Sequence, residues 1–270
     1  MRNYVRPVTP PNHPIRRRPF YHELVREGLV VPGPDRKAVL VASPPPLPGA
    51  CDLTPGLRPL RDQGAEGCCS GFATTAARAL SHWVATGQVL DFDFAPAFAY
   101  YQARALEGTT DQDAGATIGD ELAALEAYGC CHESLMPYVV GQFAQPPSEA
   151  ASKDAESYRV GLVVPVDTSS HLNVLQALAS RRPVVFGFLV FPSFEQTGPD
   201  GMVRMPGPDE VPLGGHAGLA CGYDNGPQVI DDANSWGTGW GKGGHCFMPY
   251  DFVEQLWDEA YLFLPSAVVE

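Results

Sequence analysis

The hydrophobic pattern of this chain changes once along its length, from a helical period to strand-like runs. Residues 69–86 repeat apolar side chains every four positions, which predicts an amphipathic helix with one face against a core. Further helices are predicted at 118–128 and 170–180. The strands predicted after Pro183 are 184–191, 216–223, 228–231, 244–248 and 260–264. Helices first and strands afterwards predict an α+β protein with two lobes rather than alternating βαβ units.

Local signals set the expected ends of two of these helices. Gly87 and Gly129 follow the periodic segments, and glycine is the residue that most often ends a helix. Thr117 and Asp120 have the spacing of a capping box, so we expect the second helix to begin directly after Thr117.

The N-terminal segment differs from the rest of the chain. Residues 1–46 are rich in proline and arginine, and apart from a short helix at 20–27 we expect an extension that precedes one domain at 47–270. Residues 1–50 carry eight basic and three acidic residues, a net +5. Of the total charge of −13 this leaves −18 for residues 51–270. One hypothesis is therefore that the basic segment docks on the acidic body and acts as an autoinhibitory arm. The other is that residues 1–46 are a leader without such a role.

Charge and hydropathy also limit the partners and the compartment. An acidic body repels phosphate backbones, so we expect no nucleic-acid partner. No apolar run approaches the length of a membrane span, so no membrane partner is expected either. The N-terminus lacks the apolar stretch of a secretory signal peptide. We therefore favour a cytoplasmic location, with export by another route left open.

The cysteines do not form the pattern of a secreted disulfide framework. There are seven, an odd number, and two adjacent pairs occur at Cys68-Cys69 and Cys130-Cys131. A zinc site at Cys130, Cys131 and His132 is conceivable from residue type, but the usual Cys-x2–4-Cys spacing is missing. We expect no metal and no other cofactor.

Cys69 is the candidate nucleophile. It stands in the first turn of the predicted helix 69–86, behind the glycine-containing loop 62–67. Backbone N–H groups at a helix N-terminus favour a negative charge, so we expect them to lower the pKa of the thiol towards the reactive thiolate. The alternative is that Cys69 is a small buried core residue, as most free cysteines are.

A cysteine nucleophile requires a base, and the base requires a group that orients it. His216 follows two glycines at the start of a predicted strand, where its ring can face an open site. Asn234 opens the segment 234–241, NSWGTGWG, whose glycines permit a tight backbone path and whose tryptophans can shield a polar group from water. The alternative for this segment is a glycine turn with core tryptophans.

These segments together resemble the papain family of cysteine peptidases. The run 63–73, QGAEGCCSGFA, resembles the nucleophile motif, in which a glutamine stands six residues before the cysteine. The segment Gly215-His216-Ala217 is similar to the histidine strand, and NSWGTGWG matches the asparagine motif almost letter for letter. The order cysteine, histidine, asparagine is also that of the family, and the resemblance is closer to bacterial and viral members than to plant and lysosomal ones.

The resemblance implies a fold and a mechanism. The fold would have a helical left lobe and an antiparallel β-rich right lobe, with the active-site cleft between them. Cys69, His216 and Asn234 would form a catalytic triad that cleaves peptide bonds within a peptide or protein substrate through a thioester acyl-enzyme, and Gln63 would complete the oxyanion hole. The residues implied to contact substrate are Ala114, Gly115, Gly215, Ala217 and Trp236.

Three positions depart from the family pattern. Ser70 replaces the tryptophan that usually follows the nucleophile, and Glu66 replaces a cysteine that forms a disulfide in many members. Cys68 occupies a position usually held by a small residue such as serine. Two other functional classes stay open, a transferase or ligase on the same machinery and a binding protein without catalysis.

Overall fold

The structure is a computed structural model that describes residues 47–263. The expected helix at 20–27 and the boundary between 1–46 and the following domain lie outside the described residues. All seven cysteines fall within the described part, and each is a free thiol.

Helix α2 (Cys69–Thr86) is the central helix of the molecule and confirms the longest helix predicted from the sequence. It ends at Gly87, whose φ of 73° is left-handed, so the expected glycine stop is also confirmed. Its apolar stripe is buried through Ala73, Ala77 and Leu80, which belong to the main hydrophobic core.

Helix α4 (Ile118–Ala127) starts as its capping signal predicts, because the Thr117 hydroxyl accepts a hydrogen bond from the Asp120 N–H. Gly129 follows with a φ of 78°, and a Cβ there would lie 1.8 Å from a backbone oxygen of the next helix, α5 (Glu149–Ala155). Helix α3 (Pro96–Glu107) was not predicted. It has no side-chain cap at its start, so the sequence gives no signal for its beginning.

The second half of the chain forms one antiparallel sheet, in which the predicted strands are present with longer or shifted ends. The strand order is β2-β7-β3-β4-β5-β6, and β1 pairs with β4. The third predicted helix is α6 (His171–Ala179), and two short helices, α7 (Pro192–Glu195) and α8 (Tyr250–Leu256), were not predicted. The strands are β1 (Ala50–Asp52), β2 (Val163–Pro165), β3 (Val184–Val190), β4 (Gly214–Asp224), β5 (Val229–Ala233), β6 (His245–Pro249) and β7 (Trp257–Phe263).

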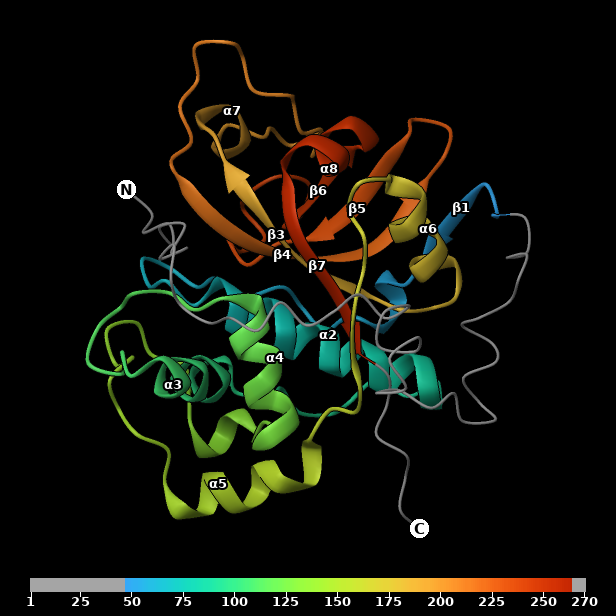
Figure 1. The fold of residues 1–270 in the computed structure, drawn as a ribbon. Coiled ribbons are helices and arrows are strands. Elements are labelled where there is room, and N and C mark those ends of the chain that lie inside the picture. Colours follow the sequence, from blue (N-terminus) through green and yellow to red (C-terminus); the bar gives the residue numbers. More distant parts are fainter. Residues whose placement is uncertain (1–46, 264–270) are drawn as a thin grey trace, which may run out of the picture.

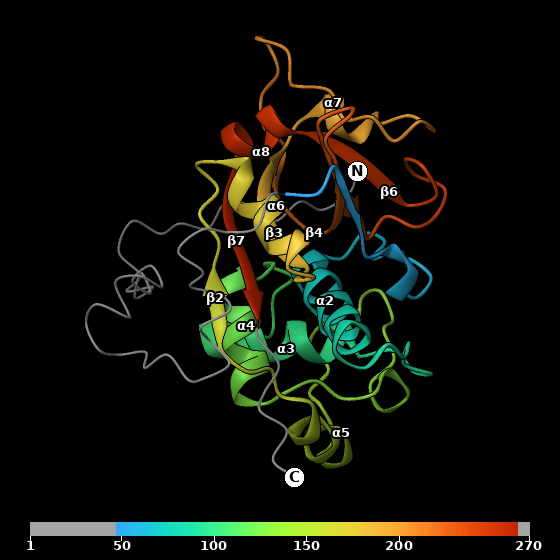
Figure 2. The same cartoon turned by 90° about the vertical axis from the view of Figure 1, so that its right-hand side faces the viewer.

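The predicted α+β, two-lobed architecture is confirmed. Helices α2 to α5 lie together on one side, and the sheet with α6 to α8 forms the other (Figure 1). Helix α2 lies where the two meet and packs against both α3 and β4 (Figure 2). The N-terminus of α2 is thereby held against the strand that carries His216. No helix within residues 47–263 is long and apolar enough to cross a membrane.

Candidate active site

The two adjacent cysteines at the start of α2 have different surroundings. Cys69 is the first residue of the helix, is 3% exposed and belongs to the main core that joins helix and sheet. Cys68 caps the helix and packs into a separate cluster within the helical lobe, with its sulfur 3.6 Å from the carbonyl oxygen of Pro96. The two sulfurs therefore differ in their packing, and only that of Cys69 lies beside the sheet.

Burial changes the expected acidity of Cys69. It raises the pKa of the thiol to about 11, and the backbone N–H groups of Ala217, Ser70 and Cys69 itself lower this pKa by less than burial raises it. The expectation that the helix start brings the pKa below its usual value is therefore wrong, because desolvation outweighs the N–H groups. Because the Ala217 N–H acts on the Cys69 sulfur, that sulfur must lie next to strand β4, which also carries His216.

His216 and Asn234 are hydrogen-bonded to each other, although 18 positions separate them in the chain. The Nε2 atom of His216 lies 2.8 Å from Oδ1 of Asn234, and both residues are buried. The antiparallel pairing of β4 with β5 produces this contact, since Asn234 directly follows β5.

One backbone contact determines the protonation of the histidine ring. The Ser235 N–H, which can only donate, lies 2.7 Å from the same Oδ1 of Asn234. That atom must then be the amide oxygen, and its histidine partner must be the donor. Neutral His216 therefore carries its proton on Nε2, which makes Nδ1 the nitrogen that can accept a proton from a thiol.

Aromatic rings shield the His216–Asn234 hydrogen bond from water. The Trp236 ring lies 4.8 Å from the His216 ring, and Trp240 packs edge-on against Trp236 at 4.9 Å. Phe188 on strand β3 contacts the histidine ring edge-on at 5.6 Å. A hydrogen bond in such an apolar setting is stronger than one in water, so the ring is held in one orientation.

Gln63 connects the loop before Cys69 to the loop that contains Asn234. Its Oε1 accepts a hydrogen bond of 2.6 Å from the Ser235 hydroxyl, and its backbone N–H donates to the Ser235 carbonyl oxygen at 2.8 Å. Its Nε2 donates to the carbonyl oxygen of Glu66 at 2.9 Å, which uses one of the two amide hydrogens. The second amide hydrogen takes no part in this bond.

The loop in front of Cys69 is also anchored to the helical lobe, through contacts that the sequence did not predict. The Tyr100 hydroxyl on α3 donates to the Asp113 carboxylate at 2.6 Å and accepts from the Gly115 N–H at 2.9 Å. The Asp113 carboxylate also accepts from the Gly67 N–H at 3.0 Å. Tyr100 therefore fixes the Gly67 loop and Gly115 to each other, and no spacing rule would have linked these three segments.

The residues predicted to contact substrate come from three segments. Gly115 is buried with a φ of 74°, and Ala114 beside it is half-buried. Gly215 and Ala217 flank His216 on β4, the first half-buried and the second 4% exposed. Trp236 is 3% exposed and covers the histidine ring. The structure thus brings Gly215, Ala217 and Trp236 to His216, while Ala114 and Gly115 lie beside the Gly67 loop.

Ser70, the departure next to the nucleophile, has a buried acidic partner. Its hydroxyl donates to Oε1 of Glu121 at 3.0 Å, and neither residue is exposed. Burial raises the pKa of Glu121 to about 8, with the Ser70 hydrogen bond opposing the shift. Sequence reasoning missed Glu121, since it looks like an ordinary helix-surface glutamate in the pattern of α4.

Comparison with known families gives the class of this arrangement. A model of the papain family cysteine proteases matches residues 47–255. The chain belongs to this family, as its motifs predict.

Individual relatives come from a virus, a bacterium and a plant. An uncharacterized peptidase C1-like protein, L477, of Acanthamoeba polyphaga mimivirus is 32% identical over 206 residues, which are 71% of this chain and 64% of the viral protein. The match therefore spans less than two thirds of that relative. Xylellain, a cysteine protease from Xylella fastidiosa, is 29% identical with a TM-score of 0.77, and the alignment covers 88% of this chain and 91% of xylellain. A cysteine protease of Carica candamarcensis in complex with E-64 shares the fold, with a TM-score of 0.64 at 22% identity over 82% of this chain and 100% of the other.

Proposed function

We propose that the chain is a cysteine endopeptidase, in which Cys69 is the nucleophile, His216 the general base and acid, Asn234 the residue that orients His216, and Gln63 an oxyanion donor. The observation that carries the proposal is the 2.8 Å hydrogen bond between His216 Nε2 and Asn234 Oδ1, on the strand next to the Cys69 sulfur. This bond gives the histidine the tautomer that a thiol needs as a base. Membership of the papain family supports the same roles.

The first half of the reaction forms a thioester. Nδ1 of His216 takes the proton of the Cys69 thiol, and the thiolate attacks the carbonyl carbon of a peptide bond. A C–S bond forms as the carbonyl π electrons move to oxygen. The resulting oxyanion accepts hydrogen bonds from the Cys69 backbone N–H, which has no carbonyl partner in the preceding turn of the helix, and from Nε2 of Gln63. The C–N bond then breaks, and the proton on Nδ1 passes to the leaving amine.

The second half returns the enzyme to its starting state. Nδ1 of His216 takes a proton from a water molecule, whose oxygen attacks the thioester carbon. The C–S bond breaks, the acid product leaves, and the Cys69 thiolate regains the proton from His216. Asn234 holds the ring through both halves, because the bond to Nε2 permits Nδ1 to act first as base and then as acid.

Thiol titration with an epoxide reagent, read together with peptide hydrolysis, tests the assignment. The full chain should lose activity as one equivalent of reagent adds to Cys69, identified by mass spectrometry. Cys69→Ala should be inactive and unlabelled, while Cys68→Ser, the matched control, should keep most activity. Activity in Cys69→Ala with loss in Cys68→Ser would reverse the assignment, and labelling of neither cysteine would remove the proposal.

A transferase or ligase would use the same thioester, with an amine in place of water. Product analysis in the presence of a competing amine separates the two reactions, since a hydrolase gives mainly the free acid.

A further inference from the structure

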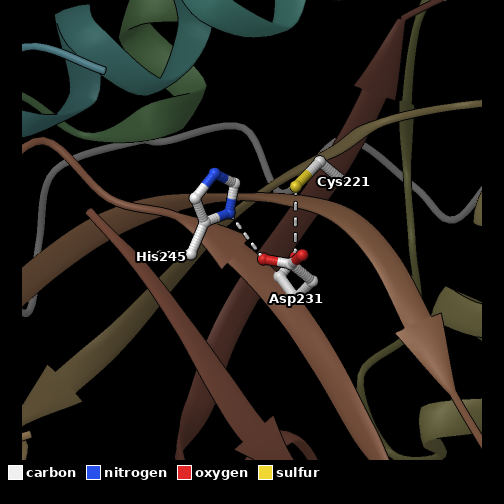
Figure 3. A group of neighbouring side chains, drawn as sticks. All are labelled: Cys221, Asp231 and His245. Carbon is white, nitrogen blue, oxygen red and sulfur yellow. Dashed lines mark hydrogen bonds and ion pairs between the residues drawn. The ribbon is translucent and has the colours of Figure 1, made fainter. Parts of the chain in front are cut away.

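Three side chains with metal-binding atoms, none of them part of the proposed triad, meet on the sheet. Cys221 on β4, Asp231 on β5 and His245 on β6 come from neighbouring strands (Figure 3). Their sulfur, carboxylate oxygen and ring nitrogen atoms all lie within 4.8 Å of one another. This is the one group of its kind among residues 47–263. The sequence did not predict it, because the three residues share no spacing motif.

The three residues already contact one another, and a bound metal ion would replace these contacts with bonds to the ion. Nδ1 of His245 lies 2.7 Å from Oδ1 of Asp231, and the Cys221 sulfur lies 3.5 Å from the Asp231 backbone oxygen. Around a tetrahedral zinc ion, with bonds of about 2.0–2.3 Å, neighbouring ligand atoms are about 3.4–3.6 Å apart. The histidine and the carboxylate would have to separate by somewhat less than about 1 Å, which side-chain rotation supplies.

The surroundings of the group are strongly acidic. The charged neighbours that act on the Cys221 thiol are the carboxylates of Asp231, Asp232 and Asp52. Asp231 also borders a cavity of about 450 Å³, whose other charged lining residues are Asp52, Asp200, Asp224 and Lys242. Four carboxylates face one ammonium group there, so a cation entering this cavity is attracted towards Asp231.

The three residues are also suitably exposed for a metal site. Cys221 is fully buried, while the side chains of Asp231 and His245 are each 21% exposed. Of the three, Asp231 lines the adjacent cavity, so water can reach the group from that side. Sulfur and imidazole nitrogen with one carboxylate suit zinc, whereas magnesium and calcium prefer oxygen ligands alone.

We propose that Cys221, Asp231 and His245 bind one zinc ion, with water from the adjacent cavity as fourth ligand. Binding releases the thiol proton and the proton between Nδ1 and Oδ1 to solvent. The ion connects β4, β5 and β6, the strands and strand ends that position His216 and Asn234. It acts on the stability of this part of the sheet and takes no part in the peptidase reaction.

Zinc and cobalt binding to the full chain carrying Cys69→Ala tests the proposal. This background removes the Cys69–His216 pair, which can itself bind zinc. One equivalent of zinc should bind in competition with a chromophoric chelator, and the melting temperature should rise with zinc concentration. Cobalt in its place should give the near-ultraviolet thiolate charge-transfer band and the strong visible bands of a tetrahedral site.

Substitutions at the three positions and at a matched neighbour identify the ligands. In the Cys69→Ala background, Cys221→Ser and Asp231→Asn should each weaken zinc binding at least about 100-fold, since even residues that only support a ligand are worth 10–100-fold. Asp224→Asn removes the same charge from the same cavity without removing a ligand, and should weaken zinc binding far less than Asp231→Asn.

Two results would overturn the site. One is a parent protein that binds no zinc equivalent or gives no thiolate band with cobalt. The other is equal zinc affinity in the parent and in Asp231→Asn. If Cys221→Ser does not fold, as judged by its melting curve without metal, the cobalt spectrum of the parent and the Asp231→Asn and His245→Ala variants decide the matter.

Discussion

Removal of the His216 imidazole should reveal how far burial opposes ionisation of the nucleophile. Burial raises the pKa of the Cys69 thiol to about 11 against the opposing backbone N–H groups. The thiolate that we propose at neutral pH therefore requires transfer of the thiol proton to His216. In His216→Ala only the backbone N–H groups remain to favour the thiolate, so its thiol should titrate near that value. At pH 7 about one thiol in 10⁴ would then be ionised, since each pH unit below the pKa lowers the thiolate fraction tenfold.

The assay is the rate of alkylation of Cys69 by iodoacetamide between pH 6 and pH 11, with the modified residue identified by mass spectrometry. Both proteins carry Cys68→Ser, so that one thiol at the start of α2 reacts. With His216 present, proton transfer to Nδ1 supplies thiolate at neutral pH, and the rate should be high and nearly flat there. In His216→Ala the rate at pH 7 should be lower by about 10²–10⁴ and should rise about tenfold per pH unit.

The result that would refute this reasoning is a His216→Ala thiol that reacts at pH 7 as fast as the parent. The thiolate would then be produced by the helix start alone, and the desolvation argument would be wrong. Circular dichroism of both proteins serves as the control for folding.

Three further predictions concern other parts of the molecule. Gln63→Ala should lower kcat by about 10²–10³ with little change in KM, the typical cost of one oxyanion donor, and an unchanged kcat would count against that role. Glu121→Gln should raise the free energy of unfolding at pH 9 by a few kcal/mol, measured by urea denaturation, and should have little effect at pH 4. The sign follows from the pKa of about 8 in the folded state. The stability that the buried carboxyl contributes is complete below its unfolded pKa near 4.5 and is lost as the pH rises through 8. An equal difference at both pH values would exclude the ionisation of Glu121 as the cause. If the N-terminal segment with its eight basic residues docks on the acidic body, a chain that starts at Pro46 should cleave a small peptide faster than the full chain at low salt. The difference between the two rates should become smaller at high salt. Equal rates at both salt concentrations would exclude this docking.

The residues of the candidate site were predicted because their segments, taken together and in order, resemble the motifs of one family. Cys69 begins a strongly periodic helix, His216 follows two glycines, and Asn234 opens a segment with two tryptophans and three glycines. Such signals depend on neighbours in the chain, so they are visible without the fold. Helix α3 carries no comparable signal, since it starts at Pro96 without a side-chain cap, and it was missed.

The contacts that hold the site together were not predictable for the opposite reason. The Gly67 N–H reaches Asp113 across 46 positions, and the Ser235 hydroxyl reaches Gln63 across 172. The shift in the pKa of Cys69 was predicted in the wrong direction, because the helix start is visible in the sequence while the depth of burial is not. Tertiary packing determines both the long-range contacts and the depth of burial, whereas hydrophobic periodicity indicates only which face of an element is buried.

Ser70 departs visibly from the family pattern, but its hydrogen-bond partner could not be read from the sequence. The sequence marks serine as unusual after the nucleophile, but the structure adds that its hydroxyl donates to Glu121, 51 positions away. The charge of Glu121 also raises the pKa of the Cys69 thiol, so the two acids are linked. Because the pKa of Glu121 is itself raised to about 8, the carboxyl is neutral at pH 7 and then places no negative charge behind the nucleophile. Burial of Glu121 is thus compatible with a thiolate at Cys69 up to the pH at which the carboxyl ionises, and above that pH its charge works against the thiolate.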